Sequence, residues 1–172
     1  MVVYGQQPSA STQNMTGASL LSSELDKLGI QRIYVGAHPS ALPKKTLEDD
    51  LTAFVCQGEG AHTLDALLNA DLFTGEGLDS VPGLWYYDSE SEQIKNNDPA
   101  PLITNLEEDL PGVAWDLLPM EKYRTANWHS WSNDNDKQPF ASVYTSLGCP
   151  YKCTFCMINV PFGGSGFRYW DP

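Results

Sequence analysis

Basic side chains and long apolar runs are both scarce in this 172-residue sequence, which has 10 Lys and Arg against 22 Asp and Glu. The formal charge of −12 would be repelled by a phosphate backbone, so we do not expect nucleic acid as a partner. No apolar run approaches the roughly 18 residues of a spanning helix, and the start of the sequence has no basic, apolar leader. We therefore expect a globular chain without a transmembrane segment, located in the cytoplasm.

Cysteine is scarce as well, since the sequence has four, too few for a scaffold held together by disulfides. Cys149, Cys153 and Cys156 nevertheless fall within eight positions of one another. In a reducing compartment such a group is more often a metal or redox site than a crosslink. Cys56 stands alone, and we interpret it as a buried thiol at the end of a strand.

The first part of the sequence alternates between strand and helix patterns. Val2–Tyr4 and Ile33–Val35 are short apolar runs, and between them a helical stretch begins at about Thr16. Leucines recur on one face of this helix, at Leu21, Leu25 and Leu28. Parallel strands joined by a helix bind ligands at their carboxyl ends, so the loops after Tyr4 and Val35 are candidate binding loops.

The alternation continues with a helix start at residues 43–47, a β-prone run at 52–56 and a helix that follows it. Residues 83–87 and 94–95 then predict a β-hairpin. We expect three regions: an α/β domain over 1–95, a proline-rich and aromatic-rich linker over 96–138, and a last region over 139–172. That last region opens with a β-prone run at 142–146 and passes directly into the cysteines.

The cysteines are spaced Cys-x3-Cys-x2-Cys, which allows three thiolates on one loop to wrap a small iron–sulfur cluster. Three ligands leave one iron of a 4Fe–4S cluster with an open position, which a site needs if it is to bind a reactant. Two alternatives stay open at this point. One is a closed zinc site completed by His129 or Cys56, and the other is an electron-transfer cluster with an outside fourth ligand.

The segment Cys149-Pro-Tyr-Lys-Cys153-Thr-Phe155-Cys156 resembles the radical S-adenosylmethionine superfamily. The resemblance implies that the three cysteines hold a 4Fe–4S cluster whose fourth iron chelates S-adenosylmethionine. Electron transfer then cleaves the sulfonium to a 5′-deoxyadenosyl radical. It also implies that Phe155 lies near the adenine, and that the cysteine loop follows the first strand of a (β/α) barrel, where catalytic residues sit at strand carboxyl ends.

The upstream region is similar to the cobalamin-binding domain of one branch of this superfamily, in residues 36–43, 58–60 and 114–119. The likeness implies a partial Rossmann-like, flavodoxin-like domain whose strand-end loops line the nucleotide tail and corrin edge of cobalamin. The candidate binding residues in these loops are Ser9, Gly36, His38, Gly58, Glu59 and Gly60. Without the likeness, residues 58–60 are a plain strand-to-helix turn.

Together these resemblances imply a cobalamin-dependent radical S-adenosylmethionine enzyme that transfers a methyl group or rearranges its substrate. A small molecule or a lipid or glycan precursor is the expected substrate, and flavodoxin or ferredoxin the expected electron donor. The family's early cobalamin motif and its later barrel strands do not occur in the sequence, so we expect a part of a longer enzyme. The alternative is a non-catalytic module that binds an iron–sulfur cluster, cobalamin or both.

Overall fold

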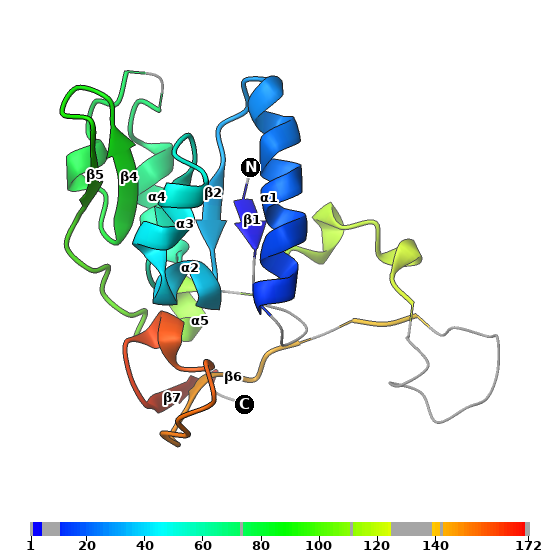
Figure 1. Cartoon of the computed structure of the whole chain (residues 1–172). Coiled ribbons are helices and arrows are strands. Elements are labelled where there is room, and N and C mark those ends of the chain that lie inside the picture. The colour runs from blue at the N-terminus through cyan, green and yellow to red at the C-terminus, as the bar shows by residue number, and fades with distance from the viewer. Residues whose placement is uncertain are drawn as a thin grey trace. The chain divides into compact units, whose positions relative to one another are not determined.

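The computed structural model describes residues 2–4, 11–72, 74–110, 112–124, 139–141 and 143–170 (Figure 1). The chain divides into two compact units. The larger comprises Met1–Leu102 with Gly148–Gly166, and the smaller comprises Ile103–Leu147 with Phe167–Pro172. Within the described ranges, no helix is both long enough and apolar enough to cross a membrane.

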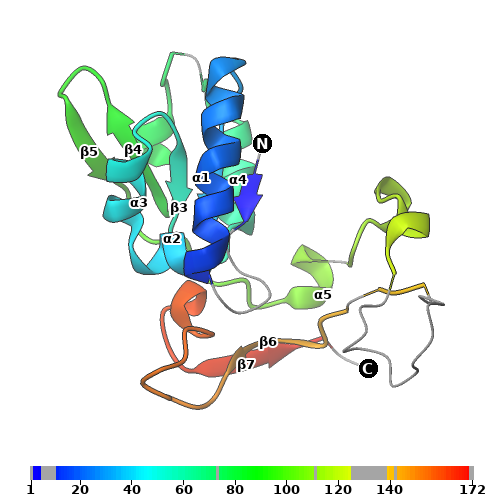
Figure 2. The same ribbon diagram turned by 45° about the vertical axis from the view of Figure 1, so that its right-hand side comes forward.

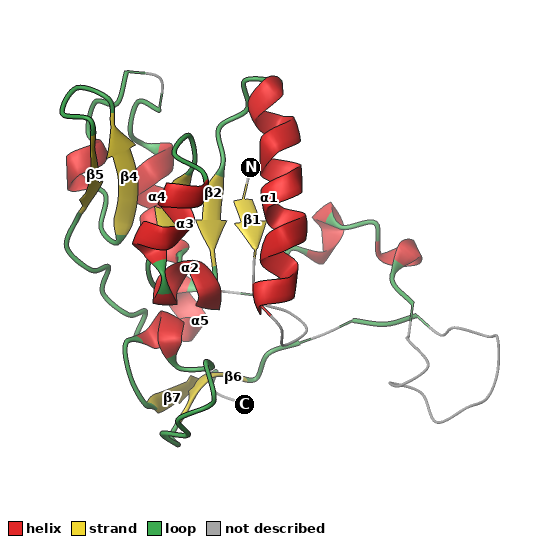
Figure 3. Cartoon of the chain, in the orientation of Figure 1, coloured by secondary structure: helices red, strands yellow, loops and turns green. Residues whose placement is uncertain are grey.

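A five-stranded sheet forms the centre of the larger unit (Figure 3). Its strands follow the order of the sequence: β1 (Val2–Tyr4), β2 (Ile33–Val35), β3 (Phe54–Cys56), β4 (Leu84–Asp88) and β5 (Gln93–Asn96). β1, β2 and β3 are parallel, whereas β4 is antiparallel to both β3 and β5. The predicted βαβ unit and hairpin are therefore confirmed, and the hairpin makes the sheet mixed.

The helices of this unit are α1 (Ser11–Lys27), α2 (Ala37–Ala41), α3 (Pro43–Asp49) and α4 (Ala61–Leu68), with a 3-10 turn η1 (Leu78–Ser80). α1 begins at Ser11 and not at about Thr16, so the predicted start is too late. α3 begins with Pro43 in its first turn, where the missing N–H of proline is not needed. α2 was not predicted, since five residues are too few to show a helical period.

Side chains of β2 and β3 alternate between the two faces of the sheet, as the pleat of a strand requires. One face packs against α1 and α3, and its buried residues are Ala18, Tyr34, Leu47, Ala53 and Val55. The other face packs against α4 and η1, and its buried residues are Ile33, Val35, Cys56, Leu67, Leu78, Val81, Leu84 and Tyr86. Helices on both faces give the sheet two apolar cores, so its ligand-accessible positions are its strand ends.

Among the described side chains of α1 the fully buried ones are small, and of its leucines only Leu25 is half-buried. Leu21 is 48% exposed and Leu28 is 72% exposed, whereas Ala18 and Ser22 are buried. Ser22 lies inward because it bonds to Arg32 and Asp50. The leucine spacing therefore does not mark the buried face of this helix.

Arg32 lies in a buried polar network at the amino ends of β2 and β3, with its side chain 4% exposed. Its guanidinium bonds to groups from several segments: Ser22 Oγ at 3.0 Å, the Ile30 carbonyl at 3.0 Å, Asp26 at 2.8 Å, Asp50 at 3.3 Å, and the Thr52 hydroxyl. The Tyr34 hydroxyl donates to Asp50 at 3.0 Å. The network therefore fastens α1 to the loops that lead into β2 and β3.

The smaller unit contains α5 (Leu106–Asp109) and two 3-10 turns, η2 (Trp115–Leu117) and η3 (Met120–Lys122). Asn105 caps α5 by accepting the Glu108 N–H. The Trp170 indole donates to the carbonyls of Leu106 and Leu110, at 3.0 and 3.1 Å. The Leu106 carbonyl also accepts the Leu110 N–H at 3.0 Å, so the indole ties Trp170 to both ends of this short helix.

β6 (Ser146–Cys149) and β7 (Gly166–Tyr169) form a two-stranded sheet (Figure 2). The strand predicted at 142–146 is therefore displaced: β6 begins at Ser146 and includes Cys149, and Ser142 lies outside the described residues. The reason is that pairing with β7, and not the β propensity of Val143 and Tyr144, sets the bounds of the strand. The first cysteine is thus held in a strand.

Candidate cofactor site at the cysteine loop

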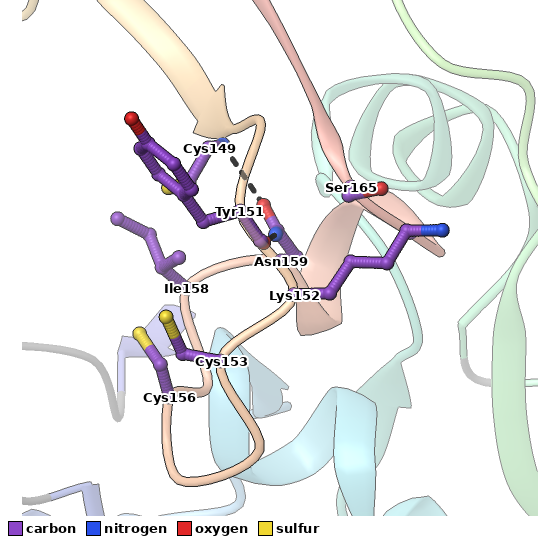
Figure 4. A pocket seen from close by; sticks show the side chains of 9 residues that line it. Cys149, Tyr151, Lys152, Cys153, Cys156, Ile158, Asn159 and Ser165 are labelled. Atoms are coloured by element: carbon purple, nitrogen blue, oxygen red, sulfur yellow. Dashed lines mark hydrogen bonds between the residues drawn. The ribbon is translucent and has the colours of Figure 1, made fainter.

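The cysteine loop, residues 149–159, leaves β6 at Cys149 and ends at the 3-10 turn η4 (Val160–Phe162). Cys149 is half-buried, whereas Cys153 and Cys156 are exposed. The Cys156 N–H donates to the Cys153 carbonyl at 3.1 Å, which closes a turn between them. In Figure 4 the side chains of Cys153 and Cys156 point to the same side of the loop.

All three cysteines line one cavity of about 540 Å³. The cavity is completed by Tyr151, Lys152, Ile158, Asn159, Gly164 and Ser165 (Figure 4). Gly164 and Ser165 belong to the segment that leads into β7, so the cavity is lined by the cysteine loop and by the chain that follows it. The structure thus brings together the three residues predicted as cluster ligands.

The thiols share a cavity without forming a preformed site for a single metal ion. Among the described residues, no three His, Cys, Asp or Glu side chains converge closely enough to hold one ion. A structural zinc site needs four ligands at about 2.0–2.3 Å from the metal. Cys56 lies in the sheet core and His129 lies outside the described residues. Three thiols around one cavity match the donor type of an iron–sulfur cluster.

Asn159 connects the two ends of the cysteine loop through its side-chain amide. The backbone N–H of Cys149 donates to Asn159 Oδ1 at 2.9 Å, and Asn159 Nδ2 donates to the Tyr151 carbonyl at 2.9 Å (Figure 4). Sequence reasoning missed this residue, because an Asn in a loop is ordinarily interpreted as a turn former. No sequence signal marked it.

Phe155, predicted to lie near an adenine, is 91% exposed, and Tyr151 is 71% exposed. Both rings therefore present their surfaces to solvent on the cysteine loop. Aromatic side chains exposed to this extent bury little of their own surface in the fold, so their packing contributes little to its stability.

The loops at the carboxyl ends of β2 and β3 are tied together by Ser40, a buried residue that the sequence did not single out. Its Oγ accepts the Gly58 N–H at 3.1 Å, and its carbonyl accepts the Gln57 side chain at 3.3 Å. The Trp85 indole donates to Gln57 at 2.9 Å. The predicted corrin-lining loops are thus fixed to each other and to β4.

Most of the predicted corrin-lining residues lie at this edge of the sheet. Gly36 precedes α2, His38 is half-buried within α2, and residues 58–60 connect β3 to α4. Gly58 and Gly60 have φ values of +127° and +101°, which side chains rarely adopt. Glu59 is half-buried. Ser9, the remaining predicted residue, lies outside the described residues.

The segment after the cysteines contacts the same edge. η4 packs against α2, and a methyl group at Gly58 would lie 3.8 Å from the Pro161 carbonyl. Glycines at the carboxyl ends of parallel strands are typical of ligand-binding edges in open α/β sheets, so the residues present fit a cofactor bound there.

Cys56 has the environment expected of a structural thiol. It is fully buried in the core of the larger unit. Burial raises the pKa of the thiol, and a hydrogen bond with Thr63 partly opposes this effect. A thiol held in its neutral form is a poor nucleophile and metal ligand. The interpretation of Cys56 as a buried thiol is confirmed.

No family model matches the chain, but curated proteins do. An uncharacterised methyltransferase of Pyrococcus horikoshii is 36% identical over 129 residues, which are 74% of this chain and 25% of that protein. The hopanoid C-3 methylase of Methylococcus capsulatus is 34% identical over 136 residues, 77% of this chain and 23% of that protein. The chain thus spans about a quarter of the length of these relatives.

The fold matches a solved enzyme over most of the chain. OxsB, a cobalamin-dependent S-adenosylmethionine radical enzyme, was solved with aqua-cobalamin and S-adenosylmethionine bound. It matches with a TM-score of 0.55 and 26% identity over 90% of this chain and 19% of OxsB. The chain is related to the cobalamin-dependent radical S-adenosylmethionine enzymes. Apo OxsB gives a TM-score of 0.53 at the same identity. The family resemblance and the α/β fold class predicted from the sequence are both confirmed.

Proposed function

We propose that this chain is part of a cobalamin-dependent radical S-adenosylmethionine enzyme that transfers a methyl group. The observation that carries the proposal is the grouping of Cys149, Cys153 and Cys156 around one cavity. The names of the curated relatives, a methyltransferase and a methylase, support methyl transfer over rearrangement.

In this proposal the three thiolates hold a 4Fe–4S cluster. Cys149 supplies a ligand at the end of a strand, whereas Cys153 and Cys156 supply ligands from one turn. Their exposure lets these two thiols reach a cluster without disturbing buried contacts. Because the protein would provide three sulfur ligands, the cluster would be able to bind S-adenosylmethionine as well.

Neighbouring residues orient the other cofactors. Phe155 offers an exposed ring on which an adenine stacks. The strand-end loops containing Gly36, His38 and Gly58 would receive cobalamin, since glycines with positive φ such as Gly36 and Gly58 let the backbone approach a ligand closely. When bound, these cofactors supply reductive cleavage of the sulfonium and a carrier for the methyl group.

The wider reaction follows from the same proposal. The cluster would require an electron donor such as flavodoxin or ferredoxin, and the methyl acceptor would be a small molecule or a lipid or glycan precursor. The chain's own contribution is to hold the thiols, the ring of Phe155 and the strand-end loops in place.

The proposal is tested by reconstituting the chain anaerobically with iron and sulfide and then measuring its metal content. The chain is also incubated with hydroxocobalamin and desalted, and the retained corrin absorbance is measured. We expect iron and sulfide in equal amounts, near four of each per chain by the stoichiometry of a 4Fe–4S cluster, and a retained corrin absorbance. Zinc at the thiols in place of iron would contradict the cluster. Iron without retained corrin would support the alternative of a simple iron–sulfur module.

A further inference from the structure

The side chain of Asn159 accepts a backbone hydrogen bond at the start of the cysteine loop. Cys149 is the last residue of β6, so beyond it the chain leaves the pairing with β7. The Cys149 N–H donates instead to Asn159 Oδ1, ten residues further along the chain, at 2.9 Å. The Asn159 side chain thus holds the backbone in place at the point where the strand ends.

The NH₂ group of the Asn159 amide binds a second backbone group of the same loop. Asn159 Nδ2 donates to the Tyr151 carbonyl at 2.9 Å. One partner is a donor and the other an acceptor, and the amide satisfies both at once because it carries a carbonyl and an NH₂ group. Aspartate could accept from Cys149 but could not donate to Tyr151, and alanine could do neither.

The backbone of Asn159 is fixed in turn. Its carbonyl accepts the Phe162 N–H at 3.1 Å, within η4, and η4 packs against α2. Asn159 is half-buried and lines the cavity that the three thiols share. The amide therefore links the start of the cysteine loop to a segment anchored on the larger unit.

From this geometry we infer that Asn159 is a positioning residue for the cluster ligands: its amide fixes Cys149 and Tyr151 so that the cysteine loop is preorganised for iron. This inference rests on the proposed cluster function. Groups that orient metal ligands typically contribute about 10–100-fold to metal affinity. The exposed half of the loop, Cys153 to Cys156, then closes on a metal centre whose first ligand is already in place.

Asn159→Ala and Asn159→Asp test the inference, with Asn69→Ala as a matched control. Asn69 is an exposed amide that donates to the Asp65 carbonyl at 2.8 Å on α4, so its loss removes a comparable bond elsewhere. The first measurement uses the metal-free chain: amide hydrogen exchange of Cys149. We expect protection in the wild type, in Asn69→Ala and in Asn159→Asp, and its loss in Asn159→Ala.

The second measurement loads each chain with iron and sulfide and follows iron release to a chelator. We expect release to be faster by about 10–100-fold in Asn159→Ala, intermediate in Asn159→Asp and unchanged in Asn69→Ala. An altered electron paramagnetic resonance spectrum in the Ala variant, with an unchanged unfolding midpoint, would separate positioning from a loss of folding.

Unchanged Cys149 protection in Asn159→Ala would overturn the inference, as would wild-type iron release from that variant. If even the wild-type chain takes up no iron, the proposed function fails. Cys149 exchange then decides by itself whether Asn159 fixes the loop.

Discussion

The carboxyl edge of the sheet and the cysteine loop are built in opposite ways. At the edge, Ser40 is buried and bonded to Gln57 and Gly58 in the loop after β3, and the glycines fit tight backbone turns. In the cysteine loop, Cys153, Phe155 and Cys156 are exposed. The edge is stabilised by the protein core, whereas the loop has little buried surface of its own. A loop of this kind takes much of its order from the metal it binds.

The largest effect should come from Cys153→Ser, which removes a thiolate from the loop. A hydroxyl is a poor ligand for iron in a cluster, so retained iron should fall at least about tenfold. The unfolding midpoint of the metal-free chain should not change, since Cys153 is exposed. Iron analysis after reconstitution measures the retained iron, and thermal denaturation measures the unfolding midpoint.

Cys56→Ala serves as the control for that experiment. Cys56 lies in the core, so this variant should lose some stability and keep its iron. Equal iron in Cys153→Ser and wild type would mean that the loop is not the metal site.

Arg32→Met tests the sheet itself, at the amino ends of β2 and β3, opposite the carboxyl edge. Removing the guanidinium leaves the carboxylate of Asp50, 17% exposed, without its charged partner. Breaking a buried ion pair costs about 3–5 kcal/mol, and urea denaturation should show a loss of that size in the free energy of unfolding.

Lys45→Met provides the matched control, because the Lys45–Asp49 pair is exposed, with both side chains at 58%. An exposed pair contributes less than about 1 kcal/mol. Equal losses in the two variants would contradict the structural role of Arg32.

Gly58→Ala tests the backbone turn at the carboxyl end of β3. Its φ of +127° costs a residue with a side chain on the order of 1–3 kcal/mol. We expect this loss in urea denaturation and a weaker retention of hydroxocobalamin after desalting.

Gly17→Ala is the control for the glycine. Gly17 lies within α1, and a methyl group there would meet nothing within 4 Å. This variant should be as stable as wild type or more stable, since alanine favours helices. Wild-type stability in Gly58→Ala would show that the turn is not constrained.

Acid should weaken the core through Asp50. Burial by itself raises the pKa of this carboxyl, but hydrogen bonds with Ser22, Thr52 and Tyr34, together with the charge of Arg32, lower it below 3.8. A group whose pKa is lower in the folded state stabilises the fold above its unfolded pKa, and this contribution is lost as the pH falls through the folded value.

We therefore expect the free energy of unfolding of the wild type to decrease between about pH 5 and about pH 2, and to decrease less in Asp50→Asn. Urea denaturation across this range measures both slopes. Identical slopes would assign the acid sensitivity to other carboxyl groups.

Much of the sheet could be predicted because its strands are short apolar runs separated by helical patterns, as in Ile33–Val35. The buried face of α1 could not, because it depends on Arg32 and Asp50, which lie beyond the helix in sequence. The start of β6 depends on its partner β7 and not on local propensity.

Some residues of the candidate site could be predicted from the sequence and others could not. The cysteines were found because thiolates at fixed spacing carry a specific chemical signal. Ser40 and Asn159 were not, since each acts by bonding to backbone groups that only the fold brings near. A single polar residue, whether in a short helix like Ser40 or in a loop like Asn159, gives no sign of such a role in the sequence.

The central claim, a 4Fe–4S cluster with one iron available to S-adenosylmethionine, is tested most directly by electron paramagnetic resonance of the reduced, reconstituted chain. We predict a signal from the reduced cluster that shifts when S-adenosylmethionine is added. A spectrum that S-adenosylmethionine leaves unchanged would contradict the claim.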